Sequence, residues 1–261
     1  MAMASPLLED WAMAYDGQHP LLDMGCAYGR NVKSALALIG SEDSKDFKDS
    51  KVQVIACDCA QEHLDAVDAL KMPQVRTAFG MLPSDLQAVK GVAAEMGGFS
   101  GILVSEVLHF LTGEGIEETI QNFKELLVPG GKLCITMFSP YANISGPDCP
   151  VGPHWRHIFE QKQRSGVKWP GEEINLKALV RDLKASLSSD DRAMQCFPSY
   201  FHVATAMQLK DALEAAGFVV LVAREGRHPG HAEHFHNDGR ESTQLVAMKP
   251  EDADSIMKAG A

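Results

Sequence analysis

An acid and two glycines follow the first apolar run of the chain, and their types and spacing are those of a ligand site. The stretch LLDMGCAYGR places Asp23 two residues before Gly25, and Gly25 and Gly29 enclose Cys-Ala-Tyr. A strand, a glycine turn and a helix allow the backbone to approach a ligand closely and present free N–H groups to it. This order is typical of sites for nucleotide-like ligands.

The acid, Asp23, favours a cationic nucleoside ligand over one that carries phosphate. Dinucleotide sites use G-x-G-x-x-G and place a pyrophosphate at the helix start. That pattern is absent here, and the carboxylate of Asp23 would repel phosphate. S-adenosylmethionine (SAM) carries an ammonium group and a sulfonium but no phosphate, so Asp23 could hold its amino group, directly or through water. Asp58 ends the run VQVIACD, where a carboxylate can accept hydrogen bonds from both ribose hydroxyls.

A second group of candidate residues is rich in histidine. Four histidines fall in residues 228–236, with Glu233 among them and Asp238 close by, a composition found in metal sites. Their spacing matches no helical or hairpin metal site, so a solvated loop is the alternative, and we assign no metal. Cys57 and Cys59 have no evident third ligand and give no metal site either.

Apolar runs alternate with helical patterns along the chain, as expected for an α/β fold. The runs predict strands at 20–25, 52–58, 74–80, 101–107, 132–138, 218–225 and 243–249. The helical patterns lie at 29–40, 60–70, 84–97, 114–127 and 205–217, and a polar loop lies at 41–51. The alternation predicts a Rossmann-like, mostly parallel sheet with helices on both faces, in a single domain over residues 1–261.

The alternation is interrupted after the fifth predicted strand. Residues 139–204 are rich in proline, hold two tryptophans and show helical patterns near 155–164 and 173–188. We expect this insertion to form a helical cap over an acceptor site at the carboxyl edge of the sheet. The candidate substrate-binding residues are Tyr141, His154, Arg156 and Trp169, and the candidate catalytic residues are His109, His157, Tyr200 and His202. Histidine and arginine in the cap favour an acceptor that bears a carboxylate or another anion.

Two residues, one near the end of the fourth predicted strand and one just after it, have alternative interpretations. His109, in VLHF, is either a catalytic base or a buried histidine beside the cofactor. Glu106 either faces solvent or caps a turn, or it takes part in the site.

Several motifs, taken in order, resemble those of class I SAM-dependent methyltransferases. They are LLDMGCAYG, VIACDCAQEHLDAV, GILVSEVLHFLTGE and LLVPGGKLCITMFSPY, within about residues 15–138, and LKDALEAAGFVV and LVAMKP also fit. The resemblance is greatest to the small-molecule type. It implies a seven-stranded sheet whose last strand is antiparallel, with SAM across the carboxyl ends of the strands.

The same resemblance implies roles for individual residues. Asp23, Gly25, Cys26, Ala27 and Gly29 would form the turn beside the methionine part of SAM. Asp58 would hold the ribose, Met81 and Leu82 would flank adenine, and Ser105 would line the methyl side. The sequence Ser-Glu-Val-Leu at 105–108 lacks the Asn-Pro-Pro-aromatic signature of many enzymes that methylate amino groups of nucleic acids and proteins.

Composition and charge limit the classes of partner that the chain is expected to bind. The 261 residues carry a formal net charge of −11, and such an acidic chain repels phosphate backbones, so nucleic acid is not expected. No apolar window reaches the length of a membrane span, and the start of the chain lacks a targeting pattern. Six scattered cysteines are interpreted as reduced thiols of a cytoplasmic protein. The oligomeric state is not predicted.

These observations together predict a SAM-dependent methyltransferase that transfers a methyl group to a small-molecule acceptor by in-line displacement. One alternative is a SAM-binding protein without catalysis, such as a sensor. Another is an oxidoreductase with a nucleotide cofactor, which the missing G-x-G-x-x-G disfavours.

Overall fold

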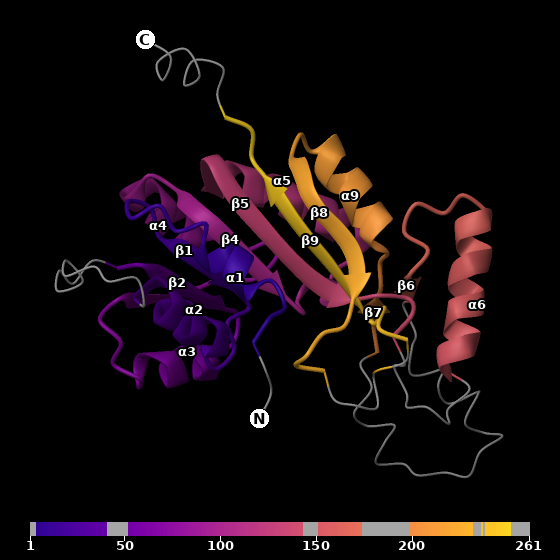
Figure 1. Cartoon of the computed structure of the whole chain (residues 1–261), viewed down its shortest axis with the longest axis horizontal. Helices are drawn as coiled ribbons and strands as arrows, with labels where there is room; N and C mark the ends of the chain where they lie inside the picture. The colour runs from indigo at the N-terminus through magenta and orange to yellow at the C-terminus, as the bar shows by residue number, and fades with distance from the viewer. Residues whose placement is uncertain are drawn as a thin grey trace.

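A central seven-stranded sheet organises the molecule (Figure 1). The computed structural model describes residues 4–40, 52–142, 151–173, 199–231, 236 and 238–251, with only the backbone at 151–153. The strand order is β3-β2-β1-β4-β5-β9-β8. The strands are β1 (Leu21–Met24), β2 (Val54–Asp58), β3 (Val75–Phe79), β4 (Phe99–Ser105), β5 (Leu127–Phe138), β8 (Val219–Gly226) and β9 (Ser242–Met248).

The direction of the strands confirms the predicted sheet. β1 to β5 pair in parallel, and β9 pairs antiparallel with both β5 and β8. Because the carboxyl ends of β1 to β5 lie at one edge, the loops that follow these strands meet there. The antiparallel β9 also begins at this edge, since its Ser242 pairs with Phe138 at the end of β5.

Helices cover both faces of the sheet, as the alternation predicts. The helices α1 (Leu8–Ala12), α2 (Arg30–Gly40) and α3 (Gln61–Asp68) pack on one face; α4 (Gln87–Met96), α5 (Gly113–Leu126) and α9 (Ala206–Ala215) pack on the other. Along β4, Leu103 packs into the core under α1, α2 and α3, and Ile102 and Val104 pack into the core under α4, α5 and α9. This alternation is the period of two expected for a strand buried on both faces. No described helix has the length and apolar character needed to cross a membrane.

Two strands begin earlier than their apolar runs predict. β4 starts at Phe99, and β5 starts at Leu127, directly after α5. The register shifts between Phe99 and Gly101, so a bulge joins the early pair Phe99–Leu127 to the regular ladder. Gly130 continues the strand because its N–H donates to the carbonyl of Lys249 at 2.9 Å.

The predicted insertion contributes a helix and a separate pair of short strands. They are α6 (Val151–Arg164), β6 (Glu172–Glu173) and β7 (Phe201–His202), and β6 pairs antiparallel with β7. In Figure 1, α6 stands at the periphery, beyond β6 and β7. The predicted helix at 155–164 is confirmed with an earlier start. Its partner at 173–188 lies outside the described residues, apart from Glu173 in β6.

The described cysteines are free thiols. Cys26, Cys57 and Cys134 are buried and Cys59 is exposed. Cys149 and Cys196 lie outside the described residues.

Candidate active site

The turn between β1 and α2 takes its shape from three left-handed residues. Gly25, Ala27 and Gly29 have φ of +82°, +45° and +73°. The N–H groups of Gly25 and Cys26 both donate to the carbonyl of Cys57, at 2.8 and 2.9 Å. A Cβ atom added to Gly25 would lie 2.3 Å from Cγ2 of Val107. The turn is therefore closed against the loop after β4 and tolerates no side chain at Gly25.

Asp58 joins this turn to the loop after β2. Its Oδ2 accepts a hydrogen bond from the N–H of Ala27, and its Oδ1 accepts one from Ala60, both at 2.9 Å. Nδ1 of His63 lies 3.1 Å from the same Oδ1. A carboxylate oxygen has two lone pairs, so these bonds leave acceptor capacity on Asp58. Its role toward a ribose stays a prediction, and His63 is a neighbour that the sequence did not identify.

Asp23 lies fully buried in β1, between β2 and β4. Neither of its oxygens has a hydrogen bond of ordinary geometry from the described residues. Burial raises the pKa of Asp23 to about 7, while Asn31 favours the charged form and the charge of Asp58 opposes it. Asp23 has no surface open to solvent in this conformation, and its role toward the amino group of SAM stays a prediction.

Replacing Asp23 with asparagine is expected to stabilise the fold increasingly as the pH rises. The folded-state pKa of about 7 exceeds the ordinary 3.8, so the native state retains a proton that the unfolded state loses between these values. The stability contributed by this group falls across that window, by at most about 1.4 kcal/mol per pH unit. Urea unfolding at pH 5 and pH 8 should therefore show a larger gain for Asp23→Asn at pH 8.

Asp16→Asn serves as the matched control. Although burial raises the pKa of Asp16, hydrogen bonds from His19 and Gln18 outweigh it and hold the pKa below its ordinary value. This change should give a small loss of stability at both pH values. A gain for Asp23→Asn that is equal at pH 5 and pH 8 would contradict the assigned titration.

The predicted adenine side lies in the turn after β3. Met81 and Asp85 exchange two backbone hydrogen bonds, at 2.7 and 2.8 Å. Met81 is 48% exposed, while Leu82 packs partly against the core. Tyr28 and Phe110, in the loops after β1 and β4, are exposed as well. The loops at the carboxyl edge thus present apolar groups to solvent, as a site for a flat base would require.

The end of β4 bears a strained acidic residue. Glu106 has φ of +59°, a left-handed conformation that side chains rarely adopt. Its N–H donates to the carbonyl of Thr136 at 2.9 Å. The hydroxyls of Ser105 and Thr136 lie 2.9 Å apart and share a hydrogen bond, which fixes the predicted methyl-side residue against β5. This backbone turns Glu106 away from the strand, and strain of this kind is characteristic of functional positions.

His109 is buried among aromatic rings in the 3₁₀ helix η1 (Leu108–Phe110). Its ring centroid lies 4.1 Å from Phe110, 5.0 Å from Phe201 and 5.6 Å from Phe138. Burial lowers its pKa to about 4, although the charge of Glu106 raises it. His109 is therefore neutral at neutral pH, which is compatible with either interpretation made from the sequence.

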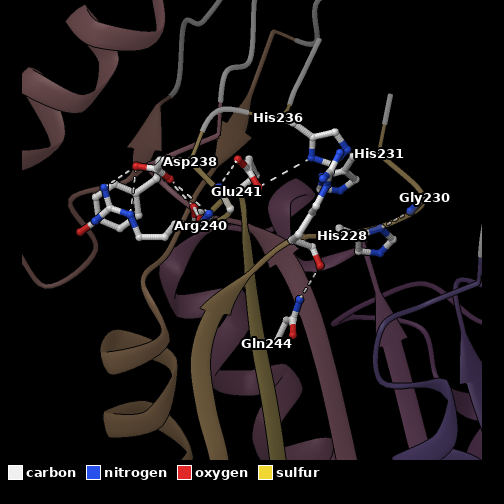
Figure 2. Close-up of polar contacts among 12 residues, drawn as sticks. His228, Gly230, His231, His236, Asp238, Arg240, Glu241 and Gln244 are labelled. Carbon is white, nitrogen blue, oxygen red and sulfur yellow. Dashed lines mark hydrogen bonds and ion pairs between the residues drawn. The ribbon is translucent and has the colours of Figure 1, made fainter. Parts of the chain in front are cut away.

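His228 and His231 lie side by side in the described part of the histidine loop (Figure 2). The rings of His228 and His231 stack at 4.3 Å, and His231 also stacks on Phe138 at 4.3 Å. The side chains of both histidines are only 6% exposed, so a solvated loop is the wrong interpretation for them. His236 lies 3.7 Å from the buried Glu241. Glu233 and His234 lie outside the described residues.

The carboxylate of Glu106 meets both stacked rings. Nε2 of His231 lies 3.3 Å from Oε2, and Nε2 of His228 lies 3.9 Å from Oε1. Although burial opposes it, the nearby histidines, His231 first, hold the pKa of Glu106 below its ordinary value. The structure thus unites a loop between β8 and β9 with the end of β4. No pattern in the sequence joins these segments.

Three residues of the predicted cap contact Leu111 or Glu117. The hydroxyl of Tyr200 and Nδ1 of His202 both donate to the carbonyl of Leu111, at 2.7 and 2.9 Å. Trp169 meets His202 edge-on at 5.3 Å and donates from Nε1 to Glu117 at 2.8 Å. These contacts give each residue an anchoring role. The catalytic roles of Tyr200 and His202, and the substrate contact of Trp169, stay predictions.

The residues predicted on α6 divide into two groups. Arg156 donates to the carbonyl of Tyr141 at 3.5 Å, and its guanidinium lies 5.6 Å from that ring. His154 and His157 are exposed. Among the described residues, no hydrogen bond or ring contact joins either of them to Glu106. The structure therefore brings Arg156 and Tyr141 together and leaves His154 and His157 on the outer surface of the helix.

The sheet order and strand directions are those of the class I SAM-dependent methyltransferase fold. No family model and no curated protein matches the sequence. Solved structures do match. A SAM-dependent methyltransferase from Methanosarcina mazei is 13% identical with a TM-score of 0.58, over 96% of this chain and 100% of that one.

Two further solved structures are similar to this chain over nearly its whole length. The glycopeptide N-methyltransferase MtfA, complexed with SAM, is 14% identical with a TM-score of 0.55, over 95% of each chain. A putative SAM-dependent methyltransferase from Listeria monocytogenes is 14% identical with a TM-score of 0.54, over 94% of this chain and 96% of that one. The chain thus has the class I methyltransferase fold that the sequence motifs imply.

Proposed function

We propose that this chain is an enzyme that transfers a methyl group from SAM to a small-molecule acceptor. The observation that carries the proposal is the left-handed turn at residues 25–29, which Asp58 holds at the carboxyl edge of the sheet. Nucleoside ligands of open α/β sheets bind at this edge. The likeness to solved methyltransferases supports the same assignment through the fold.

The residues around the turn fit a cationic nucleoside ligand. Asp23 supplies a buried carboxyl group whose charged form an ammonium group would favour, and Asp58 retains acceptor capacity for the ribose. Met81 offers apolar surface for adenine. SAM supplies an activated methyl group, so the chain mainly has to align the acceptor and exclude water. Glu106 and His109 follow β4 and lie on the acceptor side in this proposal.

We further propose that residues 139–204 cover the acceptor site. Tyr200 and His202 anchor this segment to Leu111 in the loop between β4 and α5, and Trp169 anchors it to Glu117 of α5. Nε of Arg156 is buried without a hydrogen-bond partner among the described residues, which supports an anionic acceptor. The free thiols of the described cysteines support a cytoplasmic location.

SAM and its demethylated product are expected to bind and to raise the melting temperature. A ligand at about 100 times its dissociation constant stabilises the native state by about 2.7 kcal/mol. Thermal shift and calorimetry with SAM, the demethylated product and NAD should show binding of the first two only. An absent shift at about a millimolar of either would overturn the cofactor assignment.

A screen of acceptors with labelled SAM then tests catalysis. Label transferred to a small molecule supports the enzyme. Tight SAM binding with no labelled product across carboxylate, hydroxyl, amine and thiol acceptors would favour the non-catalytic alternative.

A further inference from the structure

We propose that Glu106, His228 and His231 bind a divalent first-row transition metal, such as Zn²⁺, at the carboxyl end of β4. One ligand atom from each residue lies within 4.8 Å of the others. Glu106 follows β4 in the chain, whereas both histidines, labelled in Figure 2, come from the connection between β8 and β9. The fold therefore assembles the three donors from two separate segments.

The donors are held in place before a metal binds. The side chains of His228 and His231 are 6% exposed and that of Glu106 is 21% exposed. His231 is stacked between His228 and Phe138, with interplanar angles of 11° and 9°. The bond from Glu106 N–H to Thr136 maintains the left-handed backbone that directs the carboxylate to the histidines. Such preorganisation reduces the ordering that metal binding requires.

The chemistry of the donor set selects the class of metal. Two imidazole nitrogens and one carboxylate oxygen suit Zn²⁺, Fe²⁺, Co²⁺ or Ni²⁺, whereas Mg²⁺ and Ca²⁺ prefer oxygen alone. Neither oxygen of Glu106 has a hydrogen bond of ordinary geometry from the described residues, and the same is true of Nε2 of His228. A cation between them would satisfy these buried atoms together.

One contact must change when the metal binds. The N–H of Gly230 donates to Nδ1 of His228 at 3.0 Å, which places the proton of the neutral ring on Nε2. Coordination through Nε2 moves this proton to Nδ1 and opens the bond to Gly230. Gly230 lies in a turn, so only a local rotation of its peptide is required. Without a metal, the same atoms form a proton-sharing cluster around Glu106, which is the competing arrangement.

The site also specifies an acceptor class, and this part rests on the proposed function. Three protein ligands leave at least one coordination position open. An acceptor that bears a hydroxyl or carboxylate oxygen can occupy it. The metal would then position an oxygen nucleophile at the carboxyl end of β4, beside the proposed SAM site.

The test is a metal titration of the whole chain, without an affinity tag, after treatment with a chelator. Co²⁺ binding is followed by calorimetry and by its visible absorption, in the absence of SAM and acceptor. We expect one Co²⁺ per chain, and Mg²⁺ in excess should not displace it. Glu106→Gln, His228→Ala and His231→Ala should each weaken binding by about 100-fold or more, since loss of even outer-shell partners costs 10–100-fold.

Matched controls remove donors outside the site. His154→Ala removes an exposed histidine of α6, His236→Ala removes a histidine of the same loop, and Cys59→Ser removes the exposed thiol. Each should bind Co²⁺ within about twofold of the unmodified chain, well short of the 10–100-fold losses seen for ligand-shell changes. Circular dichroism verifies that each variant is folded, and the two histidine variants decide the outcome if Glu106→Gln does not fold.

Absence of Co²⁺ and Zn²⁺ binding by the folded, unmodified chain would overturn the metal site, as would unchanged affinity in His228→Ala and His231→Ala. The proposed function is judged separately, by the response to SAM. A chain that binds Co²⁺ but not SAM retains the metal site and loses the methyltransferase assignment.

Discussion

Replacing Gly25 with valine is expected to abolish SAM binding, with a loss of affinity above about 100-fold. A side chain here meets Cγ2 of Val107 at 2.3 Å and must adopt φ of +82°. The turn then has to move away from the loop after β4, and the hydrogen bonds of Gly25 and Cys26 to Cys57 move with it. Calorimetry with SAM measures the loss.

Two further variants separate the clash from the backbone strain. Gly17 has φ of +78° and no atom within 4 Å of an added Cβ, so Gly17→Ala introduces the strain alone, at a site away from the turn. It should leave SAM affinity unchanged. Combining Gly25→Ala with Val107→Ala removes the clashing methyl group and should recover part of the affinity that Gly25→Ala loses. Normal binding by Gly25→Val would show that the turn is not the cofactor site.

Asp58→Ala is expected to weaken SAM binding by about 10- to 150-fold, because a hydrogen bond to a charged acceptor contributes about 1.5–3 kcal/mol. The same change leaves the N–H groups of Ala27 and Ala60 without their acceptor, so the melting temperature of the free protein should also fall. Calorimetry with SAM and thermal unfolding without it measure the two effects separately.

Asp68→Ala is the control for a lost acidic side chain. Its carboxylate accepts from the hydroxyl of Thr77 in an exposed position on α3. It should change SAM affinity by less than about twofold, as expected of an exposed residue outside the binding site. If Asp58→Ala lowers the melting temperature but binds SAM normally, Asp58 only holds the two loops together and does not bind the ribose.

The centre of the sheet was predictable because β1, β2 and β4 are buried on both faces. VIACD and GILVS are continuous apolar runs, and the glycines around them mark where the chain turns. α1 was not predicted, because five residues are too few to display a helical period. Its place depends on a distant contact, the bond from Nε1 of Trp11 to the carbonyl of Gly101 at 3.3 Å.

The site was predictable only where local sequence determines local shape. The positive φ values at Gly25 and Gly29 follow from the glycines themselves. The exposure of His154 and His157 was not anticipated, although Trp155 and Phe159, one helical turn apart, mark the buried face of α6. The cluster of Glu106, His228 and His231 could not be predicted, because it depends on the antiparallel entry of β9 into the sheet.

The junction at Ser139 has a consequence for how acceptor preference can diverge. Its N–H donates to the carbonyl of Glu241 at 3.0 Å, and its hydroxyl donates to the carbonyl of Arg240. These two hydrogen bonds thus join the start of the long segment after β5 to the loop before β9, at the edge of the sheet. Under the proposed function, insertions and deletions beyond Ser139 would alter the acceptor side while the pairings of the seven-stranded sheet stay unchanged. Acceptor preference could then change through these two segments without any change in the sheet.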